Sequence, residues 1–266
     1  MDMKLTEKVV VITGASTGLG RGIALKLAEE GAFLVIGDIN EASNPGGFDE
    51  QPEFTTAELI TRRDGQALYQ RCDVTRSEDL TALVEAATRR FGRIDIMINN
   101  AGVYRDGKLI HEFSEADLDL CMNVNVKGTF FGAQAAVRAF LQQGGGGNII
   151  NLVSTAGLQG HPWQSVYNIS KAAQANMTRC LAIEYGHEGI RVNGICPTYA
   201  KTALTRALME QPGYVDDFSE SIPLKRWGEI ADVADLAVFL ASERSSYIHG
   251  ALVRIDGGET LSRYSV

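Results

Sequence analysis

The stretch TGASTGLG, residues 13–20, closes the β-branched run KVVVIT (8–13) and opens a helical pattern. Its glycines, Gly14, Gly18 and Gly20, let the backbone turn tightly and approach a ligand closely. The start of the following helix offers unpaired N–H groups to a diphosphate. A Walker-type phosphate loop is excluded, because it needs Gly-Lys-Ser/Thr and Gly20 is followed by Arg21. The position of the loop between the first strand and the first helix therefore predicts a dinucleotide site.

Apolar runs of strand length alternate with amphipathic helical patterns along the whole chain. Several runs are apolar throughout, as expected when helices cover both faces of a parallel sheet. The helical stretches 20–31 and 78–92 each end on a glycine, which suits the end of a helix. We therefore expect one α/β domain over 1–266, a Rossmann-type doubly wound parallel sheet of seven strands with helices on both faces. The strands are predicted at 8–13, 32–37, 67–72, 94–99, 148–153, 190–195 and 251–256.

Two segments interrupt this alternation. Residues 41–54, EASNPGGFDEQPEF, are rich in Gly, Pro and acidic residues and predict a surface loop after the second strand. Such a loop could cover the adenosine of a nucleotide or merely decorate the surface, and we favour decoration. The glycine run at 142–147 resembles a linker, but a strand pattern follows at once, so we expect a turn between a helix and a strand.

Composition and charge exclude several classes of function. The formal net charge of −8 argues against nucleic acid or an anionic membrane as partner, and no apolar run reaches the roughly 20 residues of a membrane span. The strand pattern starting within ten residues leaves no room for a signal peptide. The four cysteines lie far apart, which favours small core side chains over a metal or disulfide framework. We expect a cytoplasmic protein with no metal site.

An acidic residue follows the second strand. Asp38 lies about twenty residues beyond the glycines, where a carboxylate can accept both ribose hydroxyls of an adenosine and would repel a 2′-phosphate. No lysine or arginine stands beside it, and Thr17 of the loop is not basic. The sequence therefore predicts NAD rather than NADP.

A tyrosine stands four residues before a lysine at two places, Tyr167–Lys171 and Tyr104–Lys108. On a helix, side chains four apart share a face, and a nearby ammonium favours the phenolate. Such a pair can serve as a tuned acid and base, but the spacing alone does not choose between the two matches.

The ordered motifs resemble those of the single-domain short-chain dehydrogenase/reductase family over nearly the full length. The matching segments are TGASTGLG, CDVT (72–75), NNAG (99–102), NVNVKG (123–128), NLVS (151–154), YNISK (167–171) and IDGG (255–258). In that family a serine precedes the catalytic tyrosine by about a dozen residues. Ser154 stands thirteen before Tyr167, whereas Phe91 stands thirteen before Tyr104. The resemblance therefore selects Tyr167 and discounts Tyr104 as the catalyst.

The resemblance also implies residue roles. Tyr167 would exchange the substrate proton, Lys171 would lower the tyrosine pKa and bind the nicotinamide ribose, Ser154 would hydrogen-bond the substrate oxygen, and Asn125 would hold a water for proton relay. The implied catalytic set is Asn125, Ser154, Tyr167 and Lys171. The implied cofactor contacts are Gly14, Ser16, Gly18, Leu19, Gly20, Asp38, Asp73, Val74, Asn100, Tyr167, Lys171, Pro197 and Thr202.

One motif departs from the family pattern. The segment CPTYAKT (196–202) keeps Pro197 and Thr202, but Thr198 replaces the usual glycine and Ala200 the usual branched aliphatic residue. Contacts to the nicotinamide carboxamide through this segment, and the shape of the adjacent substrate loop, are therefore open.

The substrate is expected to be a secondary alcohol or a ketone, bound between 155–163, Tyr104 and 199–218. Six apolar side chains there favour a hydrophobic or ring-bearing molecule, and His161 is expected to be an ordinary loop residue. Alternatives are an NADP-dependent ketone or acyl-carrier reductase and a non-catalytic NAD-binding regulator. The family implies a homo-oligomer, a tetramer or a dimer, formed through the helices that carry Asn125 and Tyr167. The six side chains are those of Leu158, Trp163, Tyr199, Leu204, Leu208 and Met209.

Overall fold

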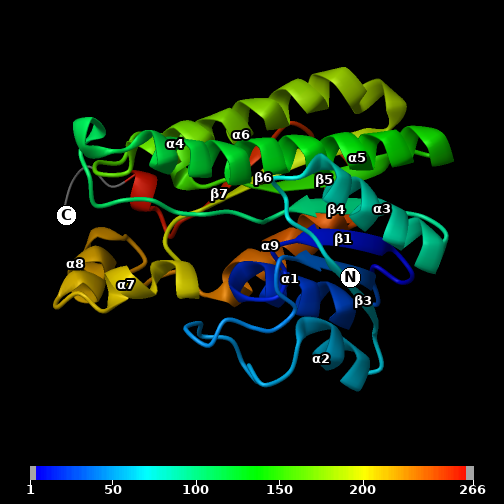
Figure 1. Cartoon of the computed structure of the whole chain (residues 1–266), viewed down its shortest axis with the longest axis horizontal. Coiled ribbons are helices and arrows are strands. Elements are labelled where there is room, and N and C mark those ends of the chain that lie inside the picture. The colour runs from blue at the N-terminus through cyan, green and yellow to red at the C-terminus, as the bar shows by residue number, and fades with distance from the viewer. Residues whose placement is uncertain (1–3, 262–266) are drawn as a thin grey trace.

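The computed structural model describes residues 4–261, which form an α/β fold around one seven-stranded parallel sheet (Figure 1). The strand order is β3-β2-β1-β4-β5-β6-β7. Every predicted strand is found within two residues of its expected bounds. The strands are β1 Val9–Thr13, β2 Phe33–Asp38, β3 Gln66–Arg71, β4 Ile96–Asn99, β5 Gly147–Leu152, β6 Ile190–Pro197 and β7 Leu252–Ile255.

Helices cover both faces of the sheet, as Figure 1 shows, and the alternation of side chains along β1 explains why. Val10 and Ile12 join a core with α1 and α9, whereas Val9 and Val11 join a second core with α3 and α5. Both faces are buried, so the strand is apolar at every position. The helices are α1 Gly18–Glu29, α2 Thr56–Arg62, α3 Ser77–Phe91, α4 Glu115–Cys121, α5 Gly128–Gln143, α6 Ser165–Tyr185, α7 Arg206–Met209, α8 Tyr214–Ser221 and α9 Ile230–Ala241.

Glycines close the helices where the sequence predicts. Gly92 caps α3 in the left-handed region with φ of 83°, and Gly31 follows the last turn of α1 with φ of 90°. The glycine run is a turn, as expected: residues 144–146 all have positive φ between the end of α5 and the start of β5.

Of the cysteines, Cys72, Cys121 and Cys196 are buried, but Cys180 is exposed on α6, so the expectation of four core cysteines is wrong for that one. The helical register turns Cys180 away from the sheet. Within residues 4–261, no helix is both long and apolar enough to cross a membrane, and no cluster of His, Cys, Asp and Glu could hold a metal ion.

The strand order reverses direction between β1 and β4, which are hydrogen-bonded neighbours in the sheet. In open α/β sheets, loops that leave strands on either side of such a point diverge and open a crevice beyond the carboxyl ends. The glycine loop follows β1 there, and the NNAG segment follows β4.

Candidate active site

A cleft of about 570 Å³ lies at the carboxyl ends of the strands. It is lined by the glycine loop, by the segments after β2, β3, β4, β5 and β6, and by the first turns of α6. Thirteen residues of the predicted site line this single cleft, although they are spread over most of the chain: Gly14, Gly18, Leu19, Gly20, Asp38, Asp73, Val74, Asn100, Ser154, Tyr167, Lys171, Pro197 and Thr202.

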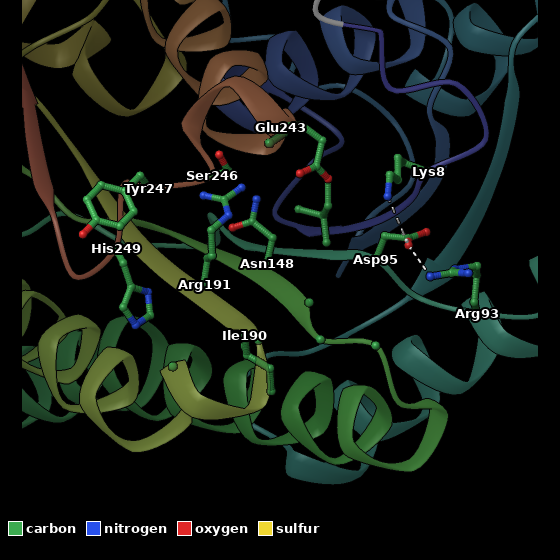
Figure 2. A pocket seen from close by; sticks show the side chains of 17 residues that line it. Lys8, Arg93, Asp95, Asn148, Ile190, Arg191, Glu243, Ser246, Tyr247 and His249 are labelled. Atoms are coloured by element: carbon green, nitrogen blue, oxygen red, sulfur yellow. Dashed lines mark ion pairs between the residues drawn. The ribbon is translucent and has the colours of Figure 1, made fainter.

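A second cavity, of about 630 Å³, lies at the amino ends of the strands (Figure 2). Four of its charged side chains, those of Lys8, Arg93, Asp95 and Arg191, are already engaged by the protein. Lys8 and Arg93 both pair with Asp95, at 3.9 and 2.7 Å, and Arg191 donates to the carbonyl oxygen of Ser245 at 3.1 Å. None of the residues predicted for the site lines this cavity. The smaller cleft at the carboxyl edge is therefore the candidate active site.

The glycine loop is shaped by close backbone contacts. A Cβ on Gly14, which has φ of 64°, would lie 2.7 Å from the Cα of Ala101, and a Cβ on Gly20 would collide with the carbonyl oxygen of Gly14. Asn100 fixes the loop from the side, because its Nδ2 donates to the carbonyl oxygens of Thr13 and Gly14 at 2.9 and 2.8 Å. The amide nitrogen of Asn100 thus holds the loop at the wall of the cleft.

The start of α1 fits a diphosphate. Within residues 4–261, the backbone N–H groups of Leu19 and Gly20 have no acceptor, and both residues line the cleft. Free N–H groups and the positive end of the helix dipole together suit an anion. The residues present therefore fit the dinucleotide that the sequence predicts.

Asp38 lies at the adenosine end of the cleft. Its carboxylate accepts hydrogen bonds from the backbone N–H groups of Ser16, at 3.1 Å, and Ile39, at 2.8 Å. Burial raises the pKa of Asp38, and these backbone hydrogen bonds oppose the rise. Ser16 meets Asp38 only through its backbone: its hydroxyl is buried without a hydrogen-bond partner among the described residues, and it does not line the cleft.

The segment after β3 lies beside Asp38 and lines the same end of the cleft, since the N–H of Cys72 donates to the carbonyl oxygen of Asp38 at 2.8 Å. Asp73 accepts hydrogen bonds from the side chain and backbone of Thr75, at 2.7 and 3.0 Å, and these lower the pKa of Asp73. Val74 packs so closely on α5 that a Cβ on Gly128 would come within 2.9 Å of it. This contact fixes the wall on which an adenine ring would rest.

The segment 41–54 is a surface loop, as its composition predicts, but the expectation that it merely decorates the surface is wrong, because it packs on α1 and the glycine loop. Arg21 of α1 is buried beneath it and donates to the carbonyl oxygens of Gln51 and Phe54, at 3.0 and 2.9 Å. Asp49 accepts hydrogen bonds from the glycine loop itself. Glycine, proline and acidic residues predict a loop, but they do not indicate what the loop packs against.

Tyr167, Lys171 and Ser154 meet at the centre of the cleft. Tyr167 and Lys171 lie one turn apart on α6, and Ser154 follows β5. The ammonium of Lys171 donates to the carbonyl oxygen of Leu152 at 2.9 Å and lies 5.6 Å from the centroid of the Tyr167 ring. The hydroxyl of Ser154 donates to the carbonyl oxygen of Pro197 at 3.4 Å and lies near enough to Tyr167 to lower the pKa of its phenol. The tertiary fold thus places serine, tyrosine and lysine around one point.

The electrostatics of this group differ from the expectation. Burial raises the pKa of Tyr167 to about 12, against the lowering effect of its hydrogen bond with Ser154. Burial also lowers the pKa of Lys171, to about 8. The expected lowering of the tyrosine pKa by the lysine is therefore not found in the protein by itself. Loss of hydration disfavours the phenolate more strongly than its neighbours favour it.

Asn125 lies one layer behind the cleft. It is fully buried in the π-helical turn Met122–Lys127, and it does not line the cleft. Its Oδ1 accepts from the N–H of Val103 at 2.8 Å, and its Nδ2 donates to Ser170 at 2.9 Å. A Cβ on Gly102 would lie 3.3 Å from Asn125 Oδ1 and 3.7 Å from Lys171 Nζ, so this glycine separates the two side chains. The sequence pattern indicated neither the π-helical turn nor this role of Gly102.

The second Tyr-x-x-x-Lys match does not form a pair. Lys108 donates to Asp117 at 2.9 Å, and residues 104–108 are not helical. Tyr104 nevertheless lines the cleft: its hydroxyl lies 2.9 Å from that of Tyr199, and its ring meets Tyr167 edge-on at 4.9 Å. The prediction that Tyr104 and Lys108 do not share a helical face is confirmed by this geometry.

The segment 196–202 at the end of β6, which departs from the family pattern, lines the cleft. Thr198 lines the cleft and donates weakly to Glu259, at 3.5 Å, while Thr202 is buried and lines it further along. Of the six apolar side chains expected here, those of Tyr199 and Leu204 line the cleft, and the other four do not. Among those four, Trp163 is 60 % exposed to solvent. His161 does line the cleft, and burial lowers its pKa.

A doubly wound sheet with a glycine loop and a tyrosine–lysine pair at its switch point defines a class, the dinucleotide-binding α/β oxidoreductases. Comparison with known sequences is consistent with that class. The sequence model of the family described as enoyl-(acyl carrier protein) reductase matches residues 14–260. The chain belongs to the short-chain dehydrogenase/reductase family.

Individual relatives match over almost their whole length. The chain is 39 % identical over 254 residues, 96 % of each chain, to a 2-dehydro-3-deoxy-D-gluconate 5-dehydrogenase of Dickeya dadantii. It is 38 % identical over 262 residues to an (S)-acetoin-forming diacetyl reductase of Staphylococcus epidermidis, covering 95 % of this chain and 98 % of that one. A gluconate 5-dehydrogenase of Burkholderia cenocepacia, solved with NADP and tartrate, superimposes with a TM-score of 0.89 at 31 % identity over 98 % of both chains. The protein is thus an NAD(P)-dependent oxidoreductase acting on CH–OH groups.

Proposed function

We propose that the protein is an NAD-dependent dehydrogenase/reductase that interconverts a secondary alcohol and its ketone, with Tyr167 as the acid and base. The observation that carries the proposal is the convergence of Ser154, Tyr167 and Lys171 in one cleft with the glycine loop. These three side chains come from a strand end and a helix, so their meeting requires the whole fold.

The chain's own residues bind the cofactor and handle the proton. The N–H groups of Leu19 and Gly20 would hold the diphosphate, and Asp38 would accept the adenosine ribose hydroxyls. The bound dinucleotide supplies the nicotinamide that accepts or returns a hydride. In oxidation, Tyr167 Oη takes the proton of the alcohol while the carbon loses its hydride. Ser154 hydrogen-bonds the same oxygen and steadies its developing charge.

A buried proton acceptor needs a partner that favours its charged form. Lys171 lies 5.6 Å from the Tyr167 ring and is already held by Leu152, so its ammonium is placed to stabilise a phenolate. Asn125 behind Gly102 would hold the water that connects this lysine to solvent. Burial raises the pKa of Tyr167 to about 12 in the protein by itself, so the proposal requires the charge of Lys171 to favour the phenolate once dinucleotide and substrate are bound.

The preference for NAD rests on Asp38. A carboxylate that lines the cleft and is fixed by Ser16 and Ile39 accepts hydroxyls and repels a phosphate. The Burkholderia cenocepacia relative was solved with NADP, so the two cofactors must be compared directly. Titration of the protein with each is expected to give tighter binding of NAD. Tighter binding of NADP would favour the alternative, an NADP-dependent reductase.

The substrate is expected to be a small secondary alcohol or ketone, held against Tyr104, Tyr199 and Leu204. The test is a panel of secondary alcohols with NAD and of ketones with NADH, followed by NADH absorbance. The panel should include apolar ring compounds, simple hydroxyketones and sugar acids, because two of the relatives are named for the last two classes. Binding of NAD without turnover of any pair would favour a non-catalytic regulator.

An oligomer is proposed through the helices that carry the catalytic residues. Large apolar side chains are exposed there: Phe130 on α5 and Ile169 and Ile183 on α6, the last 84 % exposed. A second copy of the chain would cover this face in a dimer or tetramer. Light scattering of the purified protein measures the assembly, and a monomer at micromolar concentration would contradict the proposal.

A further inference from the structure

Asp49, in the segment 41–54, lies on the glycine loop. Its Oδ1 accepts from the backbone N–H of Gly18 at 2.9 Å, and its Oδ2 accepts from the hydroxyls of Thr17 and Ser43 at 2.5 and 2.8 Å. Gly18 is the first residue of α1, so the carboxylate uses an N–H at the positive end of this helix. All three donors are neutral, and Asp49 forms no salt bridge among residues 4–261. No direct ion pair therefore compensates its negative charge, and the buried guanidinium of Arg21 attracts it only at longer range.

Two carboxylates thus occupy neighbouring positions of one loop. Asp38 accepts from the N–H of Ser16, and Asp49 accepts from Thr17 and Gly18, the next two residues. The groups to which the two carboxylates bind are only one or two residues apart in the chain. Because consecutive Cα atoms are about 3.8 Å apart, the Cα atoms of these loop residues lie within about 8 Å of one another. Thr17, Gly18 and Asp38 all line the cleft. Asp49 itself does not line the cleft, so its charge stands directly behind Thr17 and Gly18, whereas that of Asp38 faces the cleft.

The backbone that follows Asp49 in the chain is held by the buried side chain of Arg21. Arg21 is 1 % exposed, and its guanidinium donates to the carbonyl oxygen of Glu50, the next residue along the chain, at 3.1 Å. It also donates to the carbonyl oxygens of Gln51 and Phe54. On the other side, Ser43 is buried and holds the carboxylate directly. These hydrogen bonds therefore hold the backbone on which the Asp49 carboxylate is carried.

We propose that Asp49 is a second specificity-determining residue for the cofactor, which acts with Asp38 to exclude the 2′-phosphate of NADP. The inference rests on the proposed function, in which Asp38 accepts the adenosine ribose hydroxyls. A phosphate on the 2′-oxygen would lie beside Asp38 and meet the charge of Asp49 as well. An unphosphorylated ribose carries no charge at that place, so NAD meets no such repulsion.

The test is the variant Asp49→Asn, which keeps the size of the side chain and an acceptor for Thr17 but removes the charge. Binding of NAD and of NADP to the cofactor-free protein is measured by calorimetry for the variant and the wild type. We expect the Kd of NADP to fall about tenfold or more, which equals about 1.4 kcal/mol, while that of NAD changes less than about threefold. Asp235→Asn, on the exposed surface of α9, is the matched control and should change neither value.

The salt dependence of the wild type gives a second readout that needs no variant. Added salt screens repulsion between charges, so the ratio of NADP to NAD affinity should rise with ionic strength, and rise less in Asp49→Asn. If the ratio of NADP to NAD affinity in Asp49→Asn equals that of the wild type, the role of Asp49 is contradicted, while the proposed function is unaffected. Equal tightening of both cofactors would also overturn it, because Asp49 would then compete with the shared diphosphate. A wild-type protein that bound NADP more tightly than NAD would instead overturn the NAD preference of the proposed function.

Discussion

The ammonium of Lys171 donates a hydrogen bond to the carbonyl oxygen of Leu152, at 2.9 Å. Leu152 ends β5, and Ser154 follows two residues later. The bond therefore ties the helix that carries Tyr167 and Lys171 to the strand end that carries the serine. It also holds a cation in a buried place, which has consequences for stability.

Stability should depend on pH through Lys171. Its pKa is lowered by burial from 10.5 to about 8 in the folded protein. Between these values the unfolded chain keeps a proton that the folded chain has released, so the free energy of unfolding rises with pH across this window. The rise corresponds to about 3 kcal/mol. Denaturant unfolding at pH values from about 7 to 10 should show it in the wild type and not in Lys171→Met. Parallel curves for the two proteins would contradict the prediction.

Replacement of Tyr167 separates chemistry from binding. Tyr167→Phe removes the hydroxyl that exchanges the proton, so kcat should fall by about 10² to 10⁴, with the Kd of NAD nearly unchanged. The matched control is Tyr104→Phe, because that hydroxyl lies in the same cleft but meets Tyr199. This control should retain kcat within about tenfold and mainly change KM. Equal loss of kcat in both variants would argue against Tyr167 as the specific acid and base.

Arg21 should be important for stability although it lies far from the chemistry. Arg21→Met would leave three loop carbonyl oxygens without their donor and should lower the free energy of unfolding by about 3 kcal/mol. The segment 41–54 should also become a site of limited proteolysis. Arg89→Met, which removes only an exposed pair with Glu85, should cost less than about 1 kcal/mol. Resistance of 41–54 to protease in Arg21→Met would show that the loop is held by other contacts.

The glycine loop tolerates no added side chain at Gly20, because a Cβ there would collide with the carbonyl oxygen of Gly14. Gly20→Ala should therefore lower the melting temperature and weaken binding of NAD by about tenfold or more. Gly160→Ala is the control, since a Cβ at that position would meet no atom within 4 Å. Normal NAD binding in Gly20→Ala would show that the loop can shift without loss of the site.

The sequence by itself determined the fold. Continuous apolar runs require burial on both faces, and a strand followed by TGASTGLG and a helix specifies the first βαβ unit. These patterns involve residues that are near in sequence, so they can be recognised without knowledge of the tertiary contacts. Ser154, Tyr167 and Lys171 were also predictable through the resemblance to the family, whose serine–tyrosine spacing chose between two Tyr-x-x-x-Lys matches.

Only the tertiary structure decided what lies beside these residues. Desolvation sets the pKa values of Tyr167 and Lys171, and it depends on atoms from several elements rather than on the i, i+4 spacing. Asn125 lies behind Gly102, a contact that no motif records. Asp49 reaches the glycine loop from a segment whose composition indicated only a surface loop. In each case the cause is a long-range contact, and a pattern of neighbouring residues carries no information about which distant group will fill the space beside it.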